Sequence, residues 1–324
     1  MNPAFSVIFL TTLIGAGQGL FLALVTAEAF SHMGALPTQD SSFYSNGSML
    51  SLGLLIAGLT ASFFHLGHPE RAWRSAAMWR TSWLSREVIA LPAFMGVVFA
   101  YGLLHYLNWN PTVFGTAALP ETNLTLLVGI IGVALCFVLF ICTGMIYACL
   151  KFLQEWHTPL TPINYTLFGM SSGFMLATAY STQFNHEVTG LFGIWAIILT
   201  LLALLTRGTS LIRNKRIKHR STLSTAIGVR HNNIQQKAQG SMGGSYNTRE
   251  FFHGKTAALI KSVKWIFLIL VFPIPLLLMS MGLNDNTAVL LMMAFLVQYV
   301  GLIAERWFFF AQANHPQNLY YQTI

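Results

Sequence analysis

Charged residues are scarce in this chain. Only 9% of its 324 residues are Asp, Glu, Lys or Arg, whereas 54% are hydrophobic and the mean hydropathy is +0.58. Soluble domains carry roughly 25% charged residues, so the composition excludes an ordinary soluble domain and predicts an integral membrane protein. The formal charge of +8 then bears on membrane orientation, and we expect no nucleic-acid partner.

Cysteine is also rare. Cys136, Cys142 and Cys149 fall in one apolar run without a C-x-x-C spacing. This pattern argues against an iron–sulfur cluster, a zinc site or a disulfide framework in the chain, and it predicts three buried thiols. His65 is predicted at the cytoplasmic end of its span and His105 at the outer end of the next span, so a haem held by two histidines at matching depth is not expected either.

Acidic residues do not form a ladder across the predicted spans, and no internal repeat of the transporter type stands out. The usual marks of a transporter or channel are therefore missing, and such a protein is kept only as the alternative from another functional class. The adjacent Glu305 and Arg306 predict an ion pair at the membrane interface.

Long apolar runs, in contrast, are abundant. A helix needs about 20 mostly apolar residues to cross a bilayer, and eight runs meet this requirement. The sequence thus predicts an all-α integral membrane protein with eight transmembrane helices in a single membrane domain, residues 1–324. The predicted spans are 4–30, 48–66, 87–107, 123–150, 162–183, 188–206, 263–283 and 287–308.

All 18 basic residues can be assigned to one side of this arrangement. They fall in the connections 67–86 and 151–161, in the long segment 207–262 and its edge, and near the C-terminus. With eight spans these segments share a side with both termini. The positive-inside rule therefore predicts an inner (cytoplasmic) membrane protein with cytoplasmic termini and a long basic cytoplasmic loop, 207–262, between spans six and seven.

The stretch "FFHLGHPERAWRSAAMWRTSWLSRE" (63–87) concentrates polar residues between spans two and three. Its alternating Trp and Arg residues predict a short interfacial helix. His65 and Glu87 flank this helix at the predicted membrane surface. A histidine and a carboxylate there can exchange protons with a membrane-dissolved quinone, although a lone histidine at a helix end can also be purely structural.

Four stretches carry a resemblance to a known family. They are "FFHLGHPERAWRS…WLSRE" after the second span, "MIYACLKFLQEWHTPLTPINY" (145–165), "AIGVRHNNIQQKAQGSMGGSYNTREFFHGK" (226–255) and "AERWFFFAQANHPQNLYYQ" (304–322). With the start of the chain, they resemble the membrane anchor subunits of the dimethyl sulfoxide (DMSO) reductase type, the DmsC family. Within it, the last two stretches look most like the branch of cytoplasmic sulfite dehydrogenases.

The resemblance implies an eight-helix anchor without haem, metal or iron–sulfur cluster of its own. Its partners would be a ferredoxin-like iron–sulfur subunit with [4Fe–4S] clusters, docked on the cytoplasmic face, and a molybdopterin catalytic subunit. The anchor would bind quinone, either ubiquinone or menaquinone, as the quinone-reactive part of the complex. The family's quinol-linked residues fall on His65 and Glu87. Further candidates for the quinone site or the docking face are Arg71, Arg86, Tyr147, His157 and Arg306.

The charge distribution helps to choose among family branches. If the basic loop docks the iron–sulfur subunit, this subunit and the catalytic subunit lie on the cytoplasmic side, as in the sulfite-oxidising branch. We therefore predict electron transfer from sulfite to quinone. An anchor that oxidises quinol for a DMSO- or polysulfide-type reductase is the alternative in the same class, and a solvated loop near anionic lipid is the alternative to docking.

Overall fold

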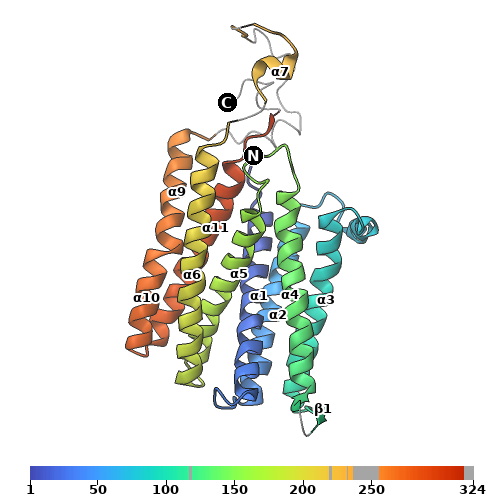
Figure 1. The fold of residues 1–324 in the computed structure, drawn as a ribbon, viewed down its shortest axis with the longest axis vertical. Coiled ribbons are helices and arrows are strands. Elements are labelled where there is room, and N and C mark those ends of the chain that lie inside the picture. Colours follow the sequence, from blue (N-terminus) through green and yellow to red (C-terminus); the bar gives the residue numbers. More distant parts are fainter. Residues whose placement is uncertain (117–118, 219–220, 232, 236–254, 317–324) are drawn as a thin grey trace.

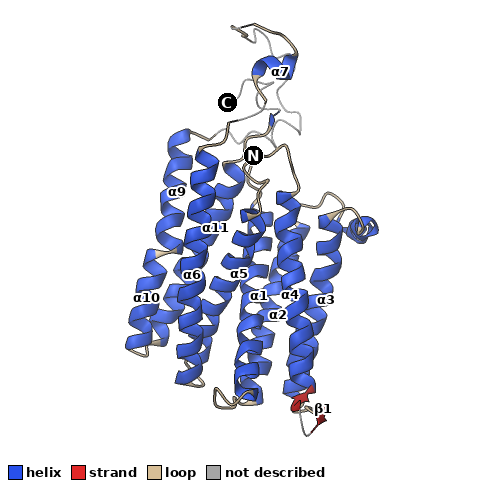
Figure 2. Cartoon of the chain, in the orientation of Figure 1, coloured by secondary structure: helices blue, strands red, loops and turns tan. Residues whose placement is uncertain are grey.

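The computed structural model describes residues 1–116, 119–218, 221–231, 233–235 and 255–316. In this part of the chain, long helices run side by side as one bundle (Figure 1), and a two-stranded antiparallel hairpin caps one end (Figure 2). The long helices are α1 (Phe5–His32), α2 (Ser41–Phe63), α3 (Trp83–Tyr106), α4 (Leu124–Ala148), α5 (Leu160–Ser181), α6 (His186–Lys215), α9 (Ala257–Val271), α10 (Pro273–Asn284) and α11 (Ala288–Ala311). The shorter elements are the 3₁₀-helix η1 (Pro69–Met78), β1 (Thr112–Thr116), β2 (Leu119–Asn123) and α7 (Leu223–Ile227).

Seven helical segments of the described chain are long and apolar enough to cross a membrane. Among them, α9 and α10 form one segment that is interrupted at Pro273, whose nitrogen cannot donate a helical hydrogen bond. These helices confirm the prediction of an all-α membrane protein, but not the predicted number of spans. The predicted fifth span corresponds to α5, which is not among the seven because it is rich in Ser and Thr. Eight spans therefore remain a prediction.

Several helix ends differ from the predicted spans. The side chain of Asp40 accepts a hydrogen bond from the backbone of Ser42, and this cap starts α2 seven residues before the predicted position 48. Helix α6 continues to Lys215, nine residues past the predicted end at 206, so the first part of the predicted basic loop is helical. The prediction of a buried Cys149 is wrong, because α4 ends at Ala148 and leaves this thiol exposed.

Helix α1 lies at the centre of the bundle and contacts α2, α4, α5 and α11. Its closest neighbour is α5, where Gly15 and Gly19 face Gly169 and Gly173. A Cβ atom on Gly19 would overlap the carbonyl oxygen of Gly169, so the two backbones touch directly. Small residues allow this close approach in membrane helices, where packing rather than hydrophobic burial drives association.

The two ends of the bundle differ. The Met1 ammonium group donates hydrogen bonds of 3.2 Å to the Phe310 carbonyl and 2.8 Å to the Ala313 carbonyl, which ties the N-terminus to the C-terminal end of α11. In Figure 1, η1, α7 and the connection between α4 and α5 lie at this same end, whereas β1 lies at the other. The described Lys and Arg residues belong to segments at the first end, which we call the basic end, or to the helix turns next to it.

Candidate functional site

Five polar side chains form a layer just inside the basic end. Each lies four to six residues from the end of its helix, about 6–9 Å along the helix axis. Because the helix ends lie side by side, the five residues are at a similar depth. These residues, which we call the polar layer, are Thr11 on α1, Glu87 on α3, Thr143 on α4, Tyr165 on α5 and Arg306 on α11.

Glu87 joins two helices of this layer. Ser82 caps the N-terminus of α3, and Glu87 follows one turn later. The Thr143 hydroxyl donates a 2.5 Å hydrogen bond to Glu87 Oε1 and so connects α4 with α3. No described residue donates to Glu87 Oε2, which leaves one oxygen of this carboxylate open for a proton or another partner.

Two small cavities lie on either side of Tyr165, each with a volume of about 20 Å³. The first is lined by Glu87, Thr143 and Gln18. The second is lined by Arg306 and by hydroxyl groups of α1 and α5. Both cavities share Thr11 and Tyr165, so they adjoin, with Glu87 lining one and Arg306 lining the other.

Arg306 belongs to a buried ionic triad. Glu305 Oε1 is 2.7 Å from Arg207 Nη2, and Glu305 Oε2 is 2.8 Å from Arg306 Nε. All three side chains are at least 96% buried. The predicted ion pair of Glu305 and Arg306 thus exists, but not at an exposed interface, because Arg207 reaches it from α6, eight residues before that helix ends. With two cations and one anion, the triad carries one excess positive charge.

Aromatic rings cover the triad and Tyr165. The Arg306 guanidinium carbon is 3.9 Å from the centroid of the Tyr165 ring, and the Tyr147 ring stacks on Tyr165 at 5.5 Å with an interplanar angle of 16°. Tyr147 also contacts Trp156. Two predicted site residues, Tyr147 and Arg306, are therefore brought together with Tyr165, although the structure does not test their role.

The candidates on the segment between α2 and α3 are more exposed and lie apart from the layer. His65 follows α2, which ends at Phe63, and no described residue pairs with its imidazole. Partial burial lowers the pKa of His65 below its usual value of 6.5. Arg71 Nε lies 3.6 Å from the exposed Glu70 carboxylate, and Arg86 donates to the Trp79 and Arg80 carbonyls. No hydrogen bond or ion pair joins His65 to Glu87.

His157, a further candidate, lies in the connection between α4 and α5. Its Nδ1 is 2.6 Å from the carbonyl oxygen of Ala148, the last residue of α4. The carbonyl oxygen of His157 in turn accepts a hydrogen bond from Arg213 at the end of α6. These contacts give His157 a role in fixing the connection at the basic end.

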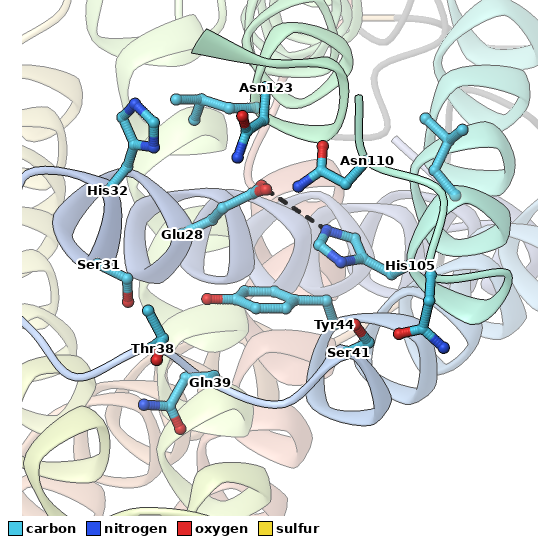
Figure 3. A pocket seen from close by; sticks show the side chains of 13 residues that line it. Glu28, Ser31, His32, Thr38, Gln39, Ser41, Tyr44, His105, Asn110 and Asn123 are labelled. Atoms are coloured by element: carbon cyan, nitrogen blue, oxygen red, sulfur yellow. Dashed lines mark ion pairs between the residues drawn. The ribbon is translucent and has the colours of Figure 1, made fainter. Parts of the chain in front are cut away.

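The opposite end of the bundle contains a larger cavity, of about 360 Å³. Figure 3 shows Glu28, Tyr44 and His105 converging on it from α1, α2 and α3. His105 Nε2 lies 3.6 Å from Glu28 Oε1, which is too long for a hydrogen bond, and the His105 ring stacks on Tyr44 at 4.5 Å. The sequence reasoning missed this pair, because the helix register that brings distant polar residues together is not visible in the sequence.

Three carboxylates within the helices, the buried Glu28 and Glu305 and the partly buried Glu87, differ in how fully they are paired. Glu28 accepts hydrogen bonds from Tyr101, at 2.7 Å, and from Thr125. Glu305 has an arginine on each oxygen. Glu87 has a partner on one oxygen only. Among these three, Glu87 is the carboxylate that can bind or release a proton without first breaking an ion pair or a second hydrogen bond.

The sequence reasoning also missed Thr11, Thr143 and Tyr165 as parts of the layer and Arg207 as part of the triad. The only signal of the first three was a polar residue within an apolar run, which by itself indicates an ordinary interhelical hydrogen bond. In the described part of the chain, no group of three His, Cys, Asp or Glu residues is arranged to hold a metal ion. The hydroxyl groups, the carboxylate and the guanidinium of the layer can transfer protons and form hydrogen bonds.

Comparison with known proteins gives a consistent result. The sequence model of the DMSO reductase anchor subunit (DmsC) family matches residues 1–321. A protein from Allochromatium vinosum, named as a subunit of sulfite dehydrogenase, is 56% identical over 324 residues, which cover 100% of both chains. The resemblance predicted from the sequence is confirmed.

Proposed function

The chain belongs to the DMSO reductase anchor subunit family, and from this premise we propose that it is the quinone-reactive membrane subunit of a sulfite-oxidising complex. The name of the relative from Allochromatium vinosum supports sulfite as the electron donor. In this proposal, a molybdopterin subunit oxidises sulfite and a subunit with [4Fe–4S] clusters passes the electrons on. This chain anchors both partners and delivers the electrons to ubiquinone or menaquinone.

The open oxygen of Glu87 is the observation that carries this proposal. Reduction of a quinone requires two electrons and two protons, so the site needs a group that donates protons. Glu87 lies about 6 Å inside the end of α3, near enough to the aqueous boundary to be protonated again after each transfer. Thr143 holds its other oxygen and fixes its orientation.

His65 has a complementary role in the proposal. Its neutral imidazole can donate a hydrogen bond to a quinone carbonyl or accept a proton from a quinol. The connection that contains η1 runs from the end of α2 to the start of α3. His65 lies just after α2, and Glu87 lies in the second turn of α3. A quinone that enters from the lipid beside this connection would bind between them, with Arg71 and Arg86 near the entrance and with Tyr147, His157 and Arg306 behind.

The orientation of the chain follows from the same proposal. Helix α5, the fifth span in chain order, is shielded from lipid by its neighbours and brings the number of spans to eight. Both termini are then cytoplasmic. The segment η1 lies at the membrane surface, where cation–π pairs such as Arg86 with Trp83, 4.2 Å from guanidinium carbon to ring centroid, suit the interface. The iron–sulfur subunit docks on the basic end, and the protein resides in the inner membrane.

Purification of the complex through a tag on this chain tests the function. We expect an iron–sulfur subunit and a molybdopterin subunit to co-purify, and sulfite to reduce a soluble quinone analogue through the complex. If the complex oxidises quinol but does not accept electrons from sulfite, the chain is instead the anchor of a quinol-oxidising reductase. Purification of the chain without redox partners would overturn the proposed function.

A further inference from the structure

We propose that two buried water molecules, one in each small cavity beside Tyr165, connect the Glu87 carboxylate to the Arg306 guanidinium through the Tyr165 hydroxyl. The presence of the waters follows from the geometry of the polar layer alone. Their role in the reaction rests on the proposed function. Tyr165 is thereby a positioning residue for Glu87, not a residue that touches the quinone.

The size of the cavities fits one water molecule each. Each has a volume of about 20 Å³, and a single water requires roughly 10–15 Å³ of such volume. A quinone ring is far too large for either space. The natural occupant is therefore water, provided that enough polar groups surround it.

Unpaired polar atoms provide these groups. The Tyr165 hydroxyl and Arg306 Nη1 are both buried, and neither has a hydrogen-bond partner in good geometry among the described residues, although Arg306 and Tyr147 lie close to the Tyr165 hydroxyl. Both side chains line the second cavity, and Tyr165 also lines the first, together with Glu87. Buried polar atoms without partners are rare in folded proteins, and ordered water is the usual partner where protein atoms do not reach.

The hydroxyl groups of the same cavities can only act as acceptors for these waters. Thr11 and Thr12 on α1 each donate to the carbonyl oxygen of Ile8, and Ser172 on α5 donates to that of Gly169. Each hydroxyl oxygen retains a lone pair, and the three residues line the cavities. Each water therefore has two to four possible partners, the number that buried waters usually have.

The chain has a consistent direction of hydrogen-bond donation. Arg306 has no acceptor atom and must donate to the second water, whereas an ionised Glu87 can only accept. The second water donates to the Tyr165 oxygen, the Tyr165 hydroxyl donates to the first water, and the first water donates to Glu87 Oε2. Each donor in this order has one acceptor, so the bonds polarise one another in the same sense.

The consequence for the reaction concerns the orientation of Glu87. Thr143 fixes Oε1, and the water chain fixes Oε2. Loss of the Tyr165 hydroxyl removes the group that holds the first water, and with it the donor to Oε2, but leaves the quinone contacts intact. Tyr165→Phe should then lower the turnover number and leave the KM for quinone unchanged.

Tyr180→Phe is the matched control. Tyr180 lies on the same helix, fifteen residues further along, and its hydroxyl donates to the Phe43 carbonyl near the opposite end of the bundle. Both variants lose one hydroxyl group and keep the aromatic ring. A general effect on α5 would appear in both, whereas a loss of the water chain would appear in Tyr165→Phe alone.

The test combines a density map with kinetics on the purified complex. In a cryo-electron microscopy map that resolves water, we expect one water in each cavity of the wild type and loss of the water between Tyr165 and Glu87 in Tyr165→Phe. We expect the turnover of quinone in Tyr165→Phe to fall roughly tenfold, the order expected for one buried hydrogen bond, with an unchanged KM and with wild-type kinetics in Tyr180→Phe.

The outcomes separate the two parts of the proposal. Empty cavities in the wild-type map would overturn the water site. Waters in both cavities together with wild-type turnover in Tyr165→Phe would overturn the positioning role. If Glu87→Gln also retained wild-type turnover, the proposed function of Glu87 would fail, while the water site would stand.

Discussion

The Thr143 hydroxyl donates a hydrogen bond to Glu87 Oε1 across the contact between α4 and α3. This contact holds one oxygen of the carboxylate, no described residue donates to the other, and Glu87 lines the cavity beside Tyr165. A proton donor that must act repeatedly needs both properties, because orientation requires a fixed partner and exchange requires a free oxygen. The predictions below test this arrangement and the packing that supports it.

The contact between α1 and α5 should tolerate no added methyl group. A Cβ atom at Gly173 would overlap the backbone of Gly19, so Gly173→Ala must push the two helices apart. We expect a loss of about 1–3 kcal/mol, typical of overpacking, measured as a lower thermal unfolding temperature of the purified complex in detergent. Gly190→Ala, at a position with open space, is the control and should melt like the wild type. Equal melting of both variants would contradict the packing argument.

The ionic triad should respond differently to the loss of its anion and of one cation. Glu305→Gln leaves Arg207 and Arg306 without a counter-ion in a buried site, which typically costs about 3–5 kcal/mol. Arg207→Met leaves the pair of Glu305 and Arg306 intact and removes the excess charge, so we expect a smaller loss. Thermal unfolding and the yield of assembled complex measure both effects. A larger loss of stability in Arg207→Met than in Glu305→Gln would show that the balance of charges does not determine the stability of the triad.

His65 should give quinone reduction a pH dependence on the acid side. Partial burial lowers its pKa below the usual value of 6.5, so the ring is mostly neutral at pH 7 and becomes increasingly protonated as the pH falls. The unfolded chain takes up this proton at a higher pH than the folded chain, so the contribution to stability is lost as the pH falls below 6.5. The protonated ring can supply a proton to the quinone, so the wild-type rate should rise relative to His65→Gln as the pH falls.

The control for this pH profile is His68→Gln, since His68 lies on the same connection and pairs with the exposed Glu70 at 3.1 Å. The ratio of wild-type to His68→Gln rates should stay constant with pH. A constant ratio for His65→Gln as well would remove His65 from the quinone site.

The orientation of the bundle can be tested by labelling single cysteines. Cys149 is exposed and must first be replaced by serine. In that background, Thr38→Cys in the connection between α1 and α2 should react with an impermeant maleimide from the periplasmic side. Thr225→Cys in α7, at the basic end, should react only after the membrane is opened. The reverse pattern would invert the predicted topology.

The sequence predicted the long helices better than it predicted their ends or contacts. Apolar runs locate a buried helix, but α2 begins earlier than its apolar run because Asp40 caps a polar first turn. Arg207 was assigned to a loop, since an arginine next to an apolar run usually marks the membrane boundary. Its partner Glu305 comes from a helix about a hundred residues away, and no local pattern reveals such a pairing.

In the candidate site, too, single residues were predicted better than the contacts between them. Glu87 was found because a carboxylate at the start of an apolar run is unusual and because the family resemblance pointed to it. The sequence also suggested that the turn after α2 brings His65 back beside Glu87, but the structure contains no direct contact between them. Tyr165 carried only the weak signal of a polar residue in an apolar run, since its importance depends on two cavities that only the packed bundle creates.

The most direct test of the account is the quinone reductase activity of the purified complex that carries Glu87→Gln. The substitution preserves size and removes the exchangeable carboxyl proton, while Glu187→Gln, at the exposed start of α6, serves as the control. We predict that sulfite still reduces the iron–sulfur clusters in both variants, and that quinone reduction falls on the order of 100-fold in Glu87→Gln alone, the lower range for loss of a general acid. Quinone reduction within twofold of the wild-type rate in an intact Glu87→Gln complex would contradict the central role of this carboxylate.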